Sequence, residues 1–155
     1  MITLEFSPDA ENELPARLNA FSDLSTEHEI DLRYDFFSCR VSLSINEETF
    51  LGDSYVPLLD FTMSLSYMLH TLHDSGKGSI TFTENSNEIN FRKTGSTIHA
   101  ADNSGCAANC TFDELVQTSR DFSFRALDYL FSRYPTLRNH PSLTALQESI
   151  RTFAN

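Results

Sequence analysis

Two pairs of side chains have the chemistry of metal ligands. His70 and His73 lie three residues apart in a segment with helical periodicity, and Cys106 and Cys110 form a C-x3-C pattern. Zinc accepts imidazole and thiolate ligands when they converge in a tetrahedron. However, C-x3-C is not the common zinc-knuckle spacing, and nothing links the two pairs in space. We therefore expect no metal, no other cofactor and no structural disulfide, with the histidines at a solvated helix edge and the cysteines as loop thiols.

Groups that could act as nucleophiles or as acid–base catalysts are present, but no motif arranges them. The sequence contains no G-x-S-x-G elbow, and serines such as Ser38 and Ser42 fall on polar strand faces. Glu29 and Asp31 share one face of a predicted strand and could work as an acid–base pair. Their alternation with Ile30 and Leu32 already explains them as a solvated face, and we favour that interpretation. We assign no catalytic residue.

Signals for phosphate and nucleic-acid binding are weak. The segment from Gly76 to Gly78 is too short for a P-loop and lacks its Ser or Thr. Lys77 and Lys93 are the only lysines in the chain, so no basic patch interleaved with aromatic residues is expected. The sequence predicts no direct nucleic-acid binding.

The charge of the chain is strongly asymmetric. The net charge is −11, and residues 1–60 hold 13 acidic but only three basic residues, whereas residues 61–155 hold nine acidic and eight basic residues. Such a field repels nucleic acid and anionic membranes and favours a cationic partner, although solubility alone also accounts for an acidic surface. The first residues do not form a signal peptide, no stretch has the length of a membrane span, and three cysteines are too few for a disulfide framework. We expect a cytoplasmic protein.

Hydrophobic periodicity predicts the secondary structure of the first part of the chain. Alternating apolar and polar residues predict strands at residues 2–6, 29–36, 37–45 and 49–51. The apolar parity reverses between Phe36 and Phe37, which requires a bulge, a bend or a turn there. Asn46 and Glu47 predict a turn, and residues 14–24 are expected to be irregular or helical.

From Pro57 onward the apolar spacing becomes helical. A stripe at three- and four-residue spacing predicts a helix over residues 58–72. Three alternating segments at residues 80–83, 88–93 and 96–100 predict an antiparallel meander, followed by a loop over residues 101–110. Thr111 and Glu114 match a capping box at the start of a helix that ends near Tyr134, and a last helix is predicted over residues 141–153.

This order of elements predicts an α+β fold, with antiparallel sheets packed against about three helices in a single domain over residues 1–155. The predicted core combines the apolar stripes of the helices with two strand residues: Val41, Leu43, Leu58, Phe61, Leu65, Leu69, Leu115, Phe122, Ala126, Leu143, Leu146 and Ile150.

In its layout and charge the chain resembles the small acidic α+β immunity proteins of bacterial polymorphic and contact-dependent toxin systems. The likeness includes residues 34–72, with their strands, the turn at Asn46 and Glu47, and the following helix. It implies an inhibitor that neutralises a cognate toxin by direct binding through an acidic surface. The alternative hypotheses are a small enzyme or ligand-binding domain of unknown substrate, and a structural subunit.

If the protein is such an inhibitor, its contact surface should draw on the acidic residues of the first 60 positions. We expect these carboxylates to be exposed and free of basic neighbours, and nearby aromatic side chains to supply the salt-insensitive part of the binding. The residues predicted to bind the partner are Glu29, Asp31, Glu47, Glu48, Phe50, Asp53 and Tyr55.

Overall fold

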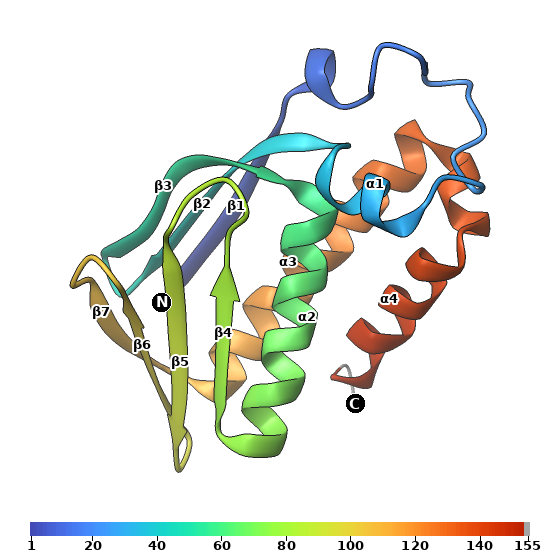
Figure 1. The fold of residues 1–155 in the computed structure, drawn as a ribbon. Helices are drawn as coiled ribbons and strands as arrows, with labels where there is room; N and C mark the ends of the chain where they lie inside the picture. Colours follow the sequence, from blue (N-terminus) through green and yellow to red (C-terminus); the bar gives the residue numbers. More distant parts are fainter. Residues whose placement is uncertain (154–155) are drawn as a thin grey trace.

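The computed structural model describes residues 1–153, which form two antiparallel sheets and four α-helices (Figure 1). The first sheet has the order β1-β2-β3 and consists of β1 (Ile2–Pro8), β2 (Ser38–Ile45) and β3 (Glu48–Pro57). The second is a meander of β4 (Lys77–Thr81), β5 (Glu88–Thr94), β6 (Thr97–Asp102) and β7 (Ala107–Thr111). The helices are α1 (Glu29–Tyr34), α2 (Leu58–Ser75), α3 (Phe112–Arg133) and α4 (Pro141–Thr152), with short 3-10 turns at η1 (Ala10–Asn12) and η2 (Pro135–Asn139). The α+β prediction is confirmed.

The hairpin of β2 and β3 forms as the sequence predicts. Asn46 and Glu47 have φ angles of 48° and 74°, the conformation of a two-residue hairpin turn that matches the twist of the strands. β3 is longer than predicted, because it continues to Pro57 beyond an irregularity in its pairing with β2. At Asp53 the chain takes a positive φ of 60°, which lets the strand bend before it enters α2.

The strand predicted at residues 29–36 is wrong, because this segment begins with the helix α1. β2 is already paired on both edges, with β1 and with β3, so a preceding strand would find no partner there. Glu29 and Asp31 lie in the first turn of α1, where carboxylates are favourable to a helix. The predicted irregularity between Phe36 and Phe37 is present. Phe37 has a φ of 62°, and this change of backbone direction allows both phenylalanine side chains to be buried.

The loop predicted at residues 101–110 is also wrong, since β7 occupies its second half. Its Ala and Asn residues have little intrinsic preference for strands. The pairing of Ile98 with Cys110 and the burial of both side chains stabilise the strand instead. The Asp102 carboxylate forms the preceding turn by accepting hydrogen bonds from the backbone N–H groups of Ser104 and Cys106.

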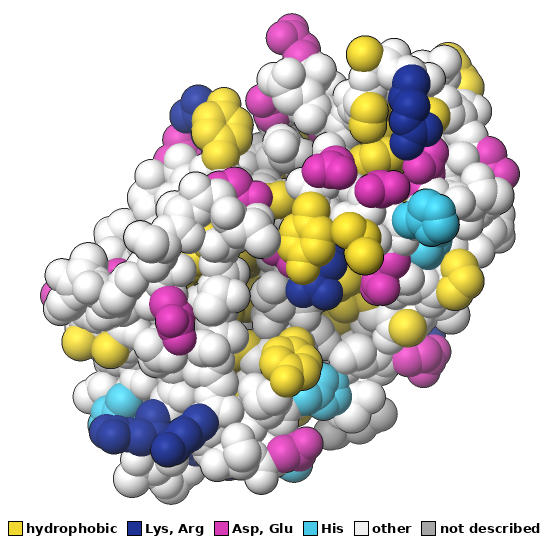
Figure 2. All heavy atoms as spheres, viewed as in Figure 1, with side chains coloured by type: hydrophobic (Ala, Val, Ile, Leu, Met, Phe, Trp, Pro, Cys, Tyr) yellow, Lys and Arg dark blue, Asp and Glu magenta, His cyan; other side chains and the backbone are white. Residues whose placement is uncertain are grey.

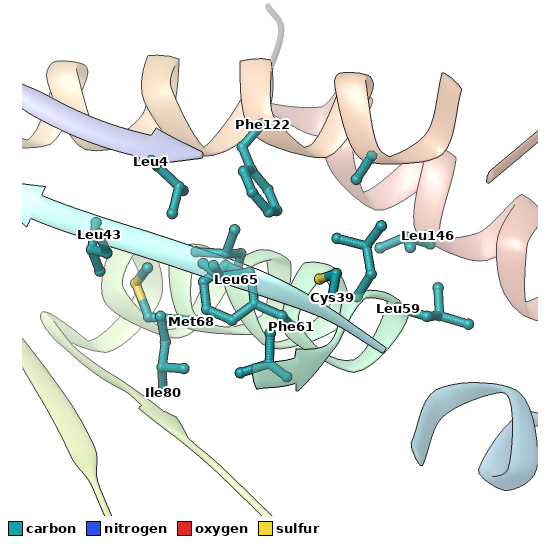
Figure 3. Packing of buried hydrophobic residues seen from close by; sticks show 14 of the residues in the cluster. Leu4, Cys39, Leu43, Leu59, Phe61, Leu65, Met68, Ile80, Phe122 and Leu146 are labelled. Atoms are coloured by element: carbon teal, nitrogen blue, oxygen red, sulfur yellow. The ribbon is translucent and has the colours of Figure 1, made fainter. Parts of the chain in front are cut away.

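Helix α2 lies at the centre of the molecule and joins the two sheets to α3 and α4 (Figure 1). Figure 3 shows its Phe61, Leu65 and Met68 packed between strand residues and Phe122 of α3. The Phe61 and Phe122 rings meet edge to face with centroids 5.4 Å apart. All twelve residues of the predicted core are buried, so the predicted helix registers are confirmed.

The predicted capping box opens α3. The Thr111 hydroxyl accepts from the Glu114 backbone N–H at 3.1 Å, and the Glu114 carboxylate accepts from the Thr111 backbone N–H at 2.9 Å. These bonds lower the pKa of Glu114 below its ordinary value. Among residues 1–153, no helix combines the length and apolar character needed to cross a bilayer.

Candidate partner-binding face

Helix α1 packs against α2, and a buried leucine and an ion pair hold it there. Leu32 is fully buried, and the Arg33 Nε atom donates to the Asp60 carboxylate at 2.5 Å. Asp60 lies in the first turn of α2 and is itself buried. Its burial raises the pKa of this carboxyl above the ordinary range, although the guanidinium beside it acts in the opposite direction. The pair therefore holds α1 in a defined position.

Large apolar side chains remain exposed where these two helices meet. Ile30 and Tyr34 of α1 are 70% and 39% exposed, and Tyr67 of α2 is 71% exposed. Figure 2 shows hydrophobic and acidic side chains next to one another over this part of the molecule. Single exposed apolar residues are common, but a group with two tyrosines has the composition of a protein interface.

Two hollows lie on either side of Tyr67 and Met63, which line both. One, of about 370 Å³, reaches Arg33 and the β4 residues Ser79 and Thr81. The other, of about 310 Å³, lies between α2 and α4 and includes Glu29, His70 and Ser149. An exposed tyrosine between two hollows is suited to knob-and-pocket contact with a partner.

Acidic side chains border this apolar group. Glu29, Asp31 and Asp35 of the α1 segment form no ion pair within the described chain, since Arg33 is engaged by Asp60 and Arg17 by Glu27. Glu29 and Asp35 are exposed, so their negative charge stays available to an incoming molecule. Asp31 is half-buried and interacts electrostatically with Arg17, so the expectation that it is exposed without a basic neighbour is wrong. We refer to these side chains together as the α1–α2 face: Glu29, Ile30, Asp31, Tyr34, Asp35, Met63 and Tyr67.

The other predicted contact residues lie on the hairpin of β2 and β3. Glu47 and Glu48 are exposed at its turn. Asp53 is 3.1 Å from the Arg40 guanidinium, so the expectation that it lacks a basic neighbour is wrong. Arg40 also donates to the hydroxyl of the partly exposed Tyr55 at 2.9 Å. Phe50 points into the core and is 5% exposed, so its predicted exposure is wrong as well.

The structure separates the predicted residues into two groups. The hairpin turn lies beside β7, where the Asn46 side chain donates to the Asn109 carbonyl, whereas α1 lies beside α2 at the other end of the hairpin (Figure 1). Only Glu29 and Asp31 belong to the α1–α2 face. Sequence reasoning missed Tyr67, although its position outside the apolar stripe of α2 already indicates an exposed aromatic residue.

The potential metal ligands do not converge. His70 contacts Ser149, His73 lies 3.0 Å from the Asp74 carboxylate, and Cys106 approaches the Thr49 carbonyl at 3.4 Å. Cys110 is buried, and desolvation raises its thiol pKa to about 11. Residues 1–153 contain no cluster of three or more His, Cys, Asp or Glu side chains that could hold a metal ion.

One arrangement bears on the alternative of a small enzyme. The Ser149 hydroxyl lies 3.0 Å from the His70 Nε2 atom and 2.5 Å from the Ser66 hydroxyl. These are the positions of a nucleophile and a base. Both serines lie within helices, whose backbone N–H groups bond along the helix, and no described hydrogen bond orients the second nitrogen of His70. The contact thus has the spacing of a nucleophile and a base, but no described hydrogen bond supplies a third group that orients the base.

Comparisons of the chain with protein-family models, with curated proteins and with solved structures gave no match. Its function is therefore inferred from the geometry and charge of its own surfaces.

Proposed function

We propose that the protein is a protein-binding inhibitor whose α1–α2 face covers a cationic surface of its partner. The observation that carries this proposal is the exposure of Ile30, Tyr34 and Tyr67 beside the unpaired carboxylates of Glu29 and Asp31. Tyrosine offers a large contact area at low conformational cost, and central aromatic residues supply much of the energy of many interfaces.

The charge of this face supports a cationic partner. Three carboxylates lie on or directly after a helix of six residues, and the nearest arginines are already paired. Facing charges of opposite sign accelerate encounter, while exposed apolar side chains slow dissociation. The face therefore has the two parts that a tight inhibitor needs.

The resemblance to immunity proteins supports a bacterial toxin domain as the partner. An enzyme that acts on a polyanion has a cationic active site, and a cluster of carboxylates can occupy such a site in place of the substrate. In this proposal, α1 presents that cluster and the Arg33–Asp60 pair keeps it in place.

The experiment compares two variants that change the charge equally. One carries Glu29→Lys and Asp31→Lys on α1, and the other carries Glu47→Lys and Glu48→Lys on the hairpin. Where a toxin-like gene lies immediately upstream, both are titrated against the toxin domain that it encodes, and otherwise against the partner captured in a pull-down with the parent protein. Association rates are measured at low and at high salt.

We expect the α1 variant to associate about tenfold or more slowly than the parent at low salt, because electrostatic steering raises association rates by about 10–10³. The difference should shrink at high salt, and the hairpin variant should stay within about threefold of the parent. Circular dichroism checks that α1 tolerates lysine in its first turn. A larger loss in the hairpin variant, or no loss in a folded α1 variant, would contradict the proposal.

A further inference from the structure

The outer face of the second sheet carries a row of cationic side chains in an otherwise acidic protein. Lys77 of β4 is directly opposite Arg92 of β5, and Arg92 is directly opposite His99 of β6. Their neighbours Phe91, Ile98 and Ala100 are buried, so the row points away from the core. Figure 2 shows basic side chains and a histidine gathered over β4, β5 and β6.

This row is not explained by stability. Like charges directly opposite one another on a sheet are destabilising. Neither Lys77 nor Arg92 forms an ion pair within residues 1–153, although the chain has 22 acidic residues for 11 basic ones. Most other arginines do contact a carboxylate: Arg17, Arg33, Arg40, Arg125, Arg133 and Arg151.

A hollow of about 350 Å³ lies along this row. Ala101 lines it with only a methyl group, while Lys77 and Arg92 provide its cationic side chains and His99 lies beside them. None of the described residues that line it is acidic. His99 is held in place by a hydrogen bond of 2.8 Å between its Nδ1 atom and the Asn109 side-chain oxygen.

We propose that this hollow binds a small molecule that carries phosphate groups. The hollow contains many hydrogen-bond donors: the Lys77 ammonium, the Arg92 guanidinium and the Asn90 amide. Together these groups have more N–H donors than the two oxygens of a carboxylate can accept. A terminal phosphate has three such oxygens and a higher charge.

A small ligand fits better than an extended polyanion. The cationic row is short and the net charge of the chain is −11, so a nucleic acid that extended beyond the hollow would meet a repulsive field. The size of the hollow lies at the lower end of the range for small-molecule sites.

Isothermal titration with sodium pyrophosphate at low salt tests this site. We expect saturable binding with a Kd of about 1 mM or tighter. Arg92→Gln should weaken this binding at least about tenfold, because it removes the bidentate donor. The matched control is Arg151→Gln, an exposed arginine of α4 paired with Glu148, which should change the Kd less than about twofold.

A second readout separates binding from folding. Pyrophosphate should raise the melting temperature of the parent but not that of Arg92→Gln, which without ligand should melt at or above the parent value because a like-charge pair is gone. Absence of saturable binding, or equal binding by the parent and Arg92→Gln, would overturn the proposal. Equal affinity for malonate would overturn the preference for phosphate, and binding of a single-stranded dT oligonucleotide without binding of pyrophosphate would indicate a nucleic-acid surface instead.

Discussion

Gly78→Ala should destabilise the protein, because strand β4 lies against α2 at this position without room for a side chain. A Cβ atom on Gly78 would be 2.8 Å from the Met68 carbonyl oxygen and 3.1 Å from both the Met68 Cγ and the Thr71 Oγ1 atoms. The closest of these is backbone, and the Met68 side chain is fully buried. The helix therefore cannot yield locally, and β4 must move away from α2.

Overpacking of this kind costs about 1–3 kcal/mol in the free energy of unfolding. Gly52→Ala is the matched control, since its Cβ would meet only the Thr49 Cγ2 atom at 3.7 Å. The control should change the free energy by less than about 0.5 kcal/mol or stabilise slightly. Urea unfolding followed by circular dichroism measures both. If Gly78→Ala unfolds like Gly52→Ala, the close approach of β4 to α2 is wrong.

Three further predictions concern the core, the thiols and the α3 cap. Leu65→Ala should lower the free energy of unfolding by about 2–5 kcal/mol, because Leu65 is buried in the middle of α2; parental stability in urea would show that the helix register is wrong. In the folded protein Cys106 should react faster with Ellman's reagent at pH 8 than Cys39 and Cys110, which are buried and whose pKa values are raised to about 12 and about 11; desolvation and the nearby Asp102 and Glu48 carboxylates raise the pKa of Cys106 as well, but its side chain is partly accessible. Release of all three thiols at equal rates would contradict this. The Glu114 carboxyl has a lowered pKa in the folded state, so its contribution to stability is present above its ordinary value of 4.5 and is lost as the pH falls through the folded-state pKa. Glu114→Gln should therefore be less stable than the parent at pH 7 and match it in strong acid, whereas a pH-independent difference would mean that the capping carboxylate is not the cause.

The sequence predicted those elements whose signal is local and agrees with their packing. The α2 stripe, the Asn46–Glu47 turn and the Thr111–Glu114 capping box each depend on residues near one another in the chain, and all are present. Apolar and polar residues alternate over residues 29–36 as they would in a strand. However, β2 is paired on both edges, so this segment cannot join the sheet beside it and begins with a helix instead. The Ala and Asn residues of β7 have almost no preference for strands, and this segment is a strand because it pairs with β6.

The candidate sites depended more strongly on three-dimensional structure. The exposure of Glu29 and Asp31 was predicted from a strand that is in fact a helix, and only Glu29 is fully exposed. The clustering of Tyr67 with α1 follows only from the packing of α1 on α2. Phe50 looked like a turn-flanking aromatic residue, but the pairing of β3 with β2 directs it into the core. Lys77 and Arg92 are 15 positions apart, so only the strand register brings them together.

The most direct test of the proposed partner-binding face is the effect of Tyr67→Ala on the affinity for the toxin domain. Phe21→Ala is the control, because Phe21 is 97% exposed and lies outside the α1–α2 face. Both side chains are largely exposed, so neither variant should unfold. We predict that Tyr67→Ala weakens the Kd by about tenfold or more, mainly through faster dissociation, and that Phe21→Ala stays within about twofold of the parent. A parental Kd for Tyr67→Ala, or a greater loss for Phe21→Ala, would contradict binding through this face.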